Sequence, residues 1–224
     1  MSVLLALDTA TPSTVVGVAR DGELVAERRH DPGPGERPGH VRELLPLAAA
    51  ALDEAGLAFA DLDRIGAGVG PGTFTGLRIG VATARALAQA GGAELAAVST
   101  LEALAVAAGP HDGPVLACLD ARRGELFVAA WAGGEPVLEP AAWRPERLAE
   151  LPSVAAGAWL ACGDGAVRSR DRLEAVGALV PDDEDPRHAV GAAALCRLAA
   201  TAPAVTRDAL VPEYVRPPDA TPRA

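Results

Sequence analysis

Residues 70–80 read GPGTFTGLRIG, and this stretch decides how the rest of the chain is interpreted. Glycine permits backbone conformations that other residues avoid, and the hydroxyl of Thr73 or Thr75 can accept a hydrogen bond from the amides of a first helical turn. Exposed amides at a helix start can bind an anion such as phosphate. Small residues spaced by four, here Gly76, Gly80 and Ala84, can instead form a smooth face on which another helix or strand packs closely. Both interpretations stay open here. The glycine-rich loop comprises Gly70, Pro71, Gly72, Thr73, Phe74 and Thr75.

The amino-acid composition excludes several kinds of catalytic and binding site for this chain. The chain has 224 residues, of which 50% are hydrophobic and 22% are charged, as in an ordinary globular protein. Its 20 basic residues are all arginine, which excludes a P-loop lysine, a Schiff-base lysine and a lysine general base. The formal net charge of -10 disfavours nucleic acid, whose binding rests on Lys and Arg contacts to phosphates. Any role involving RNA is therefore expected to be indirect.

Cysteine usage and the N-terminus indicate the compartment. Cys118, Cys162 and Cys196 are widely spaced in apolar surroundings, without a CxxC pair, and are expected to be buried reduced thiols. The opening MSVLLALD has no basic region and too short an apolar run for a signal peptide. We expect a cytoplasmic protein that makes no membrane contact.

The chain opens with a pattern typical of a meander of three strands. Residues 3–8, VLLALD, predict a strand that ends in Asp8. Two further β-rich runs meet at Asp21 and Gly22, which is a strong hairpin signal. The prolines and glycines of residues 31–39 then predict an exposed loop.

Two helices and a strand follow this loop. A helix is predicted over residues 40–55, with its regular part beginning near Leu45 because Pro46 breaks or kinks a helix interior. This helix is so broadly apolar that it needs cover on more than one side. Residues 64–69 predict a strand that leads into the glycine-rich loop, and the next helix is predicted over 75–90.

The second half repeats the opening theme. Residues 115–131, VLACLDARRGELFVAAW, again predict a strand, an Asp turn and a second strand, so Asp120 corresponds to Asp8. A last helix is predicted near residues 188–201. The repeat predicts two related α/β halves, although one repeated hairpin is weak support by itself. The predicted division is a first lobe over 1–108, a reduced second lobe over 109–216 whose last helix can pack back on the first, and a disordered tail over 217–224.

The turn after the first strand is a second candidate for phosphate chemistry. An Asp at the end of the first strand of such a hairpin is also the phosphate-binding opening of the actin, hexokinase and Hsp70 superfamily. Here the following loop, residues 9–13, reads TATPS and contains no glycine, which a loop that brings amides onto phosphate usually needs. Asp8 and Thr9 are therefore interpreted either as a vestigial phosphate loop or as residues that cap the strand turn.

Candidate metal and catalytic residues are few. The histidines at 30, 40, 111 and 188 have no second histidine at i+3 or i+4, so no helical metal pair is predicted. No serine lies in a nucleophile elbow, and no serine or cysteine has a nearby histidine. The sequence predicts no metal site, no catalytic residue and no intrinsic cofactor.

Six motifs together carry a family resemblance over close to the full length. They are LLALDTAT at 4–11, HVRELLP at 40–46, GVGPGTFTGLRIG at 68–80, VSTLEALA at 98–105, LDARRGELFVAAW at 119–131 and PEYVR at 212–216. In these motifs the chain resembles the TsaB (YeaZ) family of bacterial tRNA threonylcarbamoyladenosine biosynthesis proteins. The glycine stretch is shared with the related TsaD proteins, whereas the ARRGE hairpin and the short second half point to TsaB.

The resemblance implies an α/β protein with the two-lobed actin-like ATPase (ribonuclease H-like) fold and a reduced second lobe. It implies a non-catalytic scaffold that pairs with and activates a TsaD-like protein, joined by a TsaE-like ATPase, in the machinery that forms N6-threonylcarbamoyladenosine (t6A). ATP or ADP and metal are then expected on TsaD and TsaE. A homodimer is possible when TsaD is absent. TsaD carries two metal-binding histidines on one helix, whereas the matching helix here keeps only His40.

The family pairs with TsaD through its first two helices, which identifies the residues expected at the interface. The predicted interface residues are His40, Val41, Leu44, Leu45, Ala48, Leu52, Gly76, Leu77, Gly80 and Ala84. The alternative is a stand-alone enzyme of the same fold, either a small-molecule kinase or a glycoprotease-type peptidase.

Overall fold

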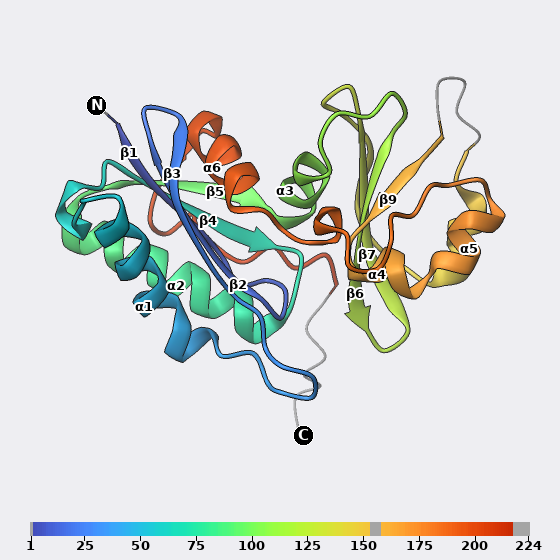
Figure 1. The fold of residues 1–224 in the computed structure, drawn as a ribbon, viewed down its shortest axis with the longest axis horizontal. Helices are drawn as coiled ribbons and strands as arrows, with labels where there is room; N and C mark the ends of the chain where they lie inside the picture. Colours follow the sequence, from blue (N-terminus) through green and yellow to red (C-terminus); the bar gives the residue numbers. More distant parts are fainter. Residues whose placement is uncertain (1, 153–157, 217–224) are drawn as a thin grey trace.

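The computed structural model describes residues 2–152 and 158–216, which form two lobes side by side (Figure 1). The predicted tail, residues 217–224, lies outside the described residues. Each lobe is built on one β-sheet, and helices pack on both faces of each sheet.

The first lobe contains a six-stranded sheet. In spatial order its strands are β10 (Ala204–Val205), β5 (Glu94–Ser99), β4 (Arg64–Gly70), β1 (Val3–Asp8), β2 (Thr14–Arg20) and β3 (Glu23–His30). The antiparallel meander β1-β2-β3 turns at Asp21 and Gly22, whose φ angles of 52° and 88° suit a tight hairpin. Because β4 runs parallel to β1, and β5 to β4, the order is that of the predicted actin-like fold.

The second lobe repeats this pattern in a shorter form. Its sheet has the order β8 (Glu135–Trp143), β7 (Glu125–Ala132), β6 (Val115–Arg122) and β9 (Leu160–Cys162). Strands β6, β7 and β8 form an antiparallel meander, and β9 runs parallel to β6 as β4 does to β1. Within the described residues no strand corresponds to β5, which makes the second lobe the reduced one.

Helices complete a layered arrangement (Figure 1). They are α1 (His40–Glu54), α2 (Phe74–Gly91), α3 (Thr100–Ala107), α4 (Asp164–Arg168), α5 (Arg170–Ala175) and α6 (Ala192–Thr201), with 3-10 turns at Phe59–Asp61, Pro145–Glu150 and Pro186–His188. Helices α1 and α2 cover one face of the first sheet, whereas α3 and α6 lie between the two sheets. Helices α4 and α5 pack on the outer face of the second sheet.

The core between the sheets joins the two lobes. Leu101 and Leu104 of α3 pack in one cluster with Leu119 of β6, Leu195 of α6 and Ala6 of β1. All five side chains are at most 5% exposed. Burial of this aliphatic surface stabilises both sheets at once, at about 25 cal/mol per Å² of apolar area.

Two boundaries differ from the sequence prediction. Helix α1 begins at His40, so Pro46 lies inside it rather than in its first turn. Pro46 is exposed, and the buried side chains of Leu44 and Ala48 hold the helix on the sheet on either side of it. The last helix, α6, packs back on the first sheet as the predicted division allows, and β10 also joins that sheet, so residues 192–210 belong to the first lobe rather than to the second.

Across residues 2–152 and 158–216, none of the helices combines the length and the apolar character that a membrane span needs.

Candidate functional site

The glycine stretch packs against the turn that follows β1. A Cβ atom on Gly72 would collide with Ala10, and one on Gly76 would collide with the carbonyl oxygen of Thr9. A Cβ on Gly80 would lie 2.5 Å from the Thr9 hydroxyl oxygen. That hydroxyl donates to the Gly76 carbonyl oxygen at 2.7 Å. The smooth face of α2 therefore serves close packing, and the segment that it meets belongs to this chain.

Asp8 is buried at the centre of this contact. One carboxylate oxygen accepts the Ala10 amide at 2.8 Å, and the other accepts the Thr100 hydroxyl at 2.7 Å. Burial raises the pKa of Asp8 above its usual value, although these two hydrogen bonds oppose the shift. A Cβ atom on Gly68 would collide with the same carboxylate. Asp8 thus organises the turn through the Ala10 amide and the Thr100 hydroxyl.

The start of α2 differs from its predicted form. Thr73 is the N-cap residue, but its hydroxyl accepts no hydrogen bond from the first helical turn. Thr75 lies inside the helix, so neither threonine caps it and that prediction is wrong. Backbone hydrogen bonds fix this end of the helix instead. The Thr73 amide donates to the Ala10 carbonyl at 2.8 Å, and the Thr73 carbonyl accepts the Leu77 amide at 3.0 Å. The loop is thereby held on the Asp8 turn.

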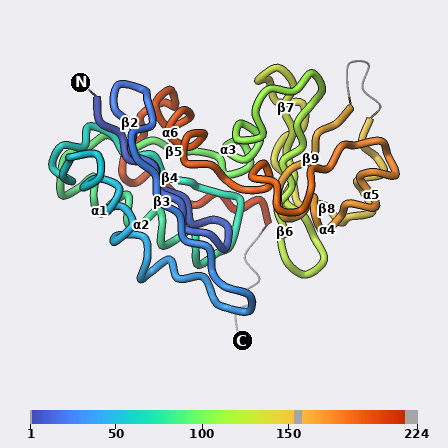
Figure 2. The backbone as a smooth tube through the Cα atoms, in the orientation of Figure 1, coloured from blue at the N-terminus to red at the C-terminus, as the bar shows by residue number. Residues whose placement is uncertain are grey.

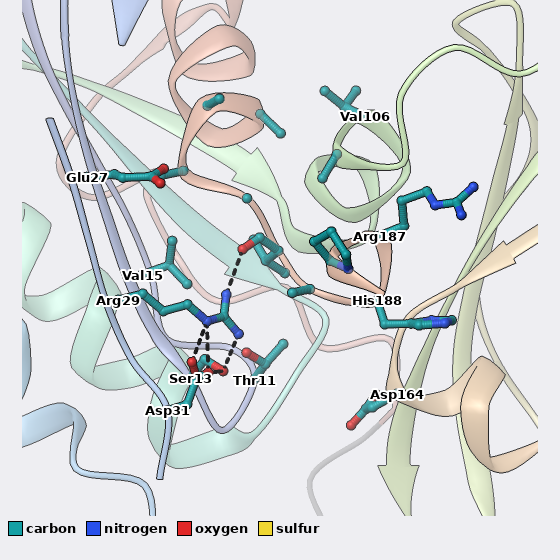
Figure 3. A pocket seen from close by; sticks show the side chains of 18 of the residues that line it. Thr11, Ser13, Val15, Glu27, Arg29, Asp31, Val106, Asp164, Arg187 and His188 are labelled. Carbon is teal, nitrogen blue, oxygen red and sulfur yellow. Dashed lines mark hydrogen bonds and ion pairs between the residues drawn. The ribbon is translucent and has the colours of Figure 1, made fainter. Parts of the chain in front are cut away.

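A cleft of about 1310 Å³ lies between the lobes (Figure 3). On the wall formed by the first lobe, Arg29 donates to both carboxylate oxygens of Asp31 at 2.8 and 2.7 Å and to the Ser13 hydroxyl at 2.7 Å. It also donates to the Val190 carbonyl at 3.1 Å, in the segment that returns from the second lobe. Hydrogen bonding from Arg29 lowers the pKa of Asp31. Arg29 therefore links the two sides of the cleft.

The opposite wall of the cleft also carries paired groups. Arg187 donates to both oxygens of Asp185, at 2.9 and 2.7 Å. His188 accepts the Gly163 amide at Nδ1 at 3.1 Å, which makes Nε2 the donor to the Pro181 carbonyl at 3.1 Å. Arg187 and Asp185 thus neutralise each other on this wall, and both ring nitrogens of His188 are hydrogen-bonded.

His40, at the start of α1, is buried beside a second histidine. Its Nδ1 lies 2.8 Å from the Thr14 hydroxyl, and Nε2 is buried without a hydrogen-bond partner. Burial lowers the pKa of His40, and the charge of His30 lowers it further. In the described part of the chain, no three His, Cys, Asp or Glu side chains gather closely enough to hold a metal ion.

A second groove, of about 440 Å³, opens beside the glycine-rich loop. It is lined by residues 71–74, 120–123, Phe127 and 213–216. At its rim Arg122 and Arg123 have φ angles of 63° and 54°, a backbone region that costs a non-glycine residue about 1–2 kcal/mol. The Arg122 amide donates to Asp120 at 2.9 Å, which helps to hold the turn.

Comparison with known proteins agrees with this geometry. The family model of TsaD, tRNA N6-adenosine threonylcarbamoyltransferase, matches residues 37–162. The tRNA threonylcarbamoyladenosine biosynthesis protein TsaB of Escherichia coli is 33% identical over 172 residues, which cover 72% of this chain and 71% of that protein. The chain belongs to the TsaB (YeaZ) family.

Solved and uncharacterised relatives extend this family assignment. YeaZ from Pseudomonas aeruginosa superposes with a TM-score of 0.80 and 31% identity, covering 96% of this chain and all of that one. An uncharacterized protein of Mycobacterium tuberculosis is 39% identical over 146 residues, or 63% of this chain. That alignment spans 64% of the mycobacterial protein's length. The two-lobed fold is thus shared with TsaB over nearly the whole chain.

The residues predicted for the TsaB interface divide into two groups. Val41 is 78% exposed and Leu45 is 49% exposed. The other eight are buried in this chain's own core, namely His40, Leu44, Ala48, Leu52, Gly76, Leu77, Gly80 and Ala84. As contact residues these eight need correction, because the sheet below α1 and the Asp8 turn below α2 already cover them. Only Val41 and Leu45 of the set offer side chains to a partner.

Sequence reasoning missed two features of the TsaB surface. Phe74 is 43% exposed and stacks on Tyr214, which is 40% exposed, with ring centroids 5.5 Å apart. The motif PEYVR marked Tyr214 as part of the family pattern but assigned it no contact. The Arg29 link to Val190 was also missed, since an arginine in a strand shows no local signal of a partner 161 residues away.

Proposed function

We propose that this chain is a non-catalytic scaffold subunit of the t6A-forming machinery, which binds and activates a TsaD-like protein together with a TsaE-like ATPase. Family membership supports the pathway, since the E. coli relative is named for threonylcarbamoyladenosine biosynthesis. In this proposal TsaD and TsaE carry the nucleotide and the metal, and tRNA contacts this chain only indirectly.

The exposed apolar pair at the start of α1 carries the proposal. Val41 and Leu45 are one helical turn apart and so lie on the same face of α1. Contiguous exposed apolar side chains on a folded protein mark interaction surfaces. A stable complex needs about 1,000 Å² of buried surface, so the partner must also cover neighbouring parts of α1 and α2.

The Asp8 turn supports the non-catalytic part of the proposal. In a phosphate-binding loop the backbone amides must remain open to the ligand. Here the Ala10 amide is bonded to Asp8, and α2 lies directly on Thr9. The Ala10 amide is therefore already bonded within the chain, which supports the proposal that nucleotide binds to the partners.

The test is co-purification with a TsaD-like protein from the same organism, followed by nucleoside analysis of tRNA. The variant Val41→Glu with Leu45→Glu places two charges on the proposed surface and should abolish both co-purification and t6A formation. The matched control is Val137→Glu with Leu179→Glu, at two residues that are each 54% exposed on the second lobe. If the α1 variant behaves like this control, the α1 surface is not the interface.

The same surface should support self-association when TsaD is absent. Light scattering of the isolated chain over a range of concentrations should then show dimer formation, and the α1 variant should shift it to monomer. A wild-type chain that stays monomeric at every concentration would contradict this part of the proposal.

The interlobe cleft favours one alternative, a small-molecule kinase. Ligand sites lie preferentially at the interfaces between domains, and the cleft of about 1310 Å³ is large enough for a nucleotide. Calorimetric titration of the isolated chain with ATP and magnesium discriminates the two functions. We expect no binding in the micromolar range, whereas such binding would favour the kinase.

A further inference from the structure

The described chain ends in a segment that returns along the first lobe. Residues 202–216, here called the C-terminal strap, follow α6 and begin with β10, whose Ala204 and Val205 pair with β5. Further along, the Leu210 side chain is fully buried in the core beneath α1 and α2. The strap is therefore an integral part of the first lobe up to this residue.

Beyond Leu210 the strap crosses to the second lobe. The Glu213 amide donates to the Val69 carbonyl at the end of β4, at 2.7 Å. Arg216 then pairs with Glu125, the first residue of β7, at 2.6 Å. Figure 2 shows the red end of the trace reaching the space between the lobes beside β6. The strap thus ties the glycine-rich edge of one lobe to the β6-β7 hairpin of the other.

Between these two contacts the strap touches the start of α2. The Tyr214 ring stacks on Phe74, and the Tyr214 hydroxyl accepts a hydrogen bond from Arg78 at 3.2 Å. The Arg78 guanidinium lies 3.7 Å from the centroid of the Phe74 ring. Two aromatic rings that are each at least 40% exposed thus form one patch with an arginine beside them.

We propose that this Phe74–Tyr214 patch extends the partner surface of α1, and that partner docking is coupled through the strap to the β6-β7 hairpin of the second lobe. This inference rests on the proposed function for the identity of the occupant, a TsaD-like chain. The patch calls for an apolar partner surface with carboxylates at its edge, because Arg78 and the exposed Arg122 flank the rings. A partner that covers Tyr214 must favour the docked strap, and by linkage the docked strap must favour the partner.

The first experiment uses the isolated chain and needs no partner. A chain that stops after Leu210 removes the crossing part of the strap, and a chain that stops after Arg216 is the matched control. Hydrogen exchange should rise about tenfold or more at residues 119–127 in the shorter chain, and it should be unchanged in the control. Unchanged exchange at the hairpin in the shorter chain would overturn the tie between the lobes.

A charge-reversal variant tests the same contact between the lobes without truncation, in case the shorter chain folds poorly. Arg216→Glu places two carboxylates together and should also raise exchange at the hairpin, whereas Arg216→Glu with Glu125→Arg should restore protection. Failure of the double variant to restore protection, or no rise in the single variant, would argue against the Arg216 contact as the tie.

The second experiment tests the coupling to the partner. Tyr214→Ala should weaken binding of the TsaD-like protein by about tenfold, and the bound partner should slow exchange at residues 211–216. Val211→Ala, at a strap residue that is 52% exposed, is the control and should leave affinity unchanged. If the wild-type chain binds no TsaD-like protein, the proposed function is wrong. The hydrogen-exchange experiment at residues 119–127 then still tests whether the strap ties the two lobes together. If the partner binds but Tyr214→Ala has no effect, the patch is not part of the surface.

Discussion

At the scale of single residues, the glycines of α2 matter because Thr9 occupies the space above them. The Thr9 hydroxyl donates to the Gly76 carbonyl at 2.7 Å, a distance that a larger residue at position 76 or 80 would prevent. Thr9 is itself fully buried. Thr9 therefore requires small residues at positions 76 and 80 of α2, although Gly76 lies 67 residues further along the chain.

Gly76→Ala tests this requirement directly. The new Cβ atom would collide with the Thr9 carbonyl oxygen, which is backbone and cannot swing aside. We expect urea denaturation to show a loss of about 1–3 kcal/mol in the free energy of unfolding. Gly91→Ala in the last turn of α2 is the control, since its Cβ would meet nothing closer than 3.6 Å. Equal stability of the two variants would show that α2 and the Asp8 turn are not in close contact.

The sequence predicted the close approach at these glycines but not what approaches. Spacing by four shows that one face of a helix is smooth, and this is a local property. Which segment lies on that face depends on the sheet order that brings Asp8 and Thr9 beneath α2. The family resemblance indicated that α1 and α2 meet a partner, but the sequence does not show which apolar residues of these helices face that partner and which face the chain's own sheet.

At the scale of elements, α1 contains a proline that its pattern places outside the regular helix. Pro46 has no amide hydrogen, so the Arg42 carbonyl four residues earlier receives no helical bond from it. The helix persists because Leu44, Ala48 and Leu52 are buried on the sheet. Tertiary packing thus outweighs a local helix breaker.

Pro46→Ala should therefore stabilise the protein. It restores the missing helical bond at an exposed site, and we expect a gain of about 1–3 kcal/mol in the free energy of unfolding. Pro145→Ala is the control, since Pro145 begins a 3-10 turn, where no helical bond is lost. Thermal unfolding followed by circular dichroism measures both variants. A loss of stability in Pro46→Ala would mean that the proline ring makes a contact that the helix needs.

Most helices and strands were predictable from the sequence, but the segments that they pack against mostly were not. The hairpin at Asp21 and Gly22, the β6-β7 hairpin and the glycine-ended α2 all carry local turn signals. The sequence analysis allowed the last helix to pack on the first lobe, but no local signal identifies the strand that it meets; Gly17 permits the contact, since a Cβ there would lie 2.8 Å from the Cys196 sulfur of α6. A glycine in a strand indicates that something approaches closely, without identifying the approaching helix.

At the scale of the whole molecule, two lobes share one core. The cluster between the sheets draws side chains from β1, β2 and β5 of the first lobe and from β6, β7 and β9 of the second. The strap and Arg29 add polar ties between the lobes at Glu125 and Val190. Such a shared core makes independent unfolding of either lobe costly, because each would expose the apolar face of the other.

Leu101→Ala tests whether the lobes unfold together. Leu101 lies in α3 between the sheets and is fully buried, so its truncation should cost about 2–5 kcal/mol. All three tryptophans, Trp131, Trp143 and Trp159, lie in the second lobe, whereas the long helices α1 and α2 lie in the first. Tryptophan fluorescence therefore reports the second lobe, whereas far-ultraviolet circular dichroism is weighted towards the long helices of the first. In urea both midpoints should fall by the same amount, while Val137→Ala on exposed β8 should move neither. A shift seen by only one of the two probes would mean that each lobe unfolds by itself.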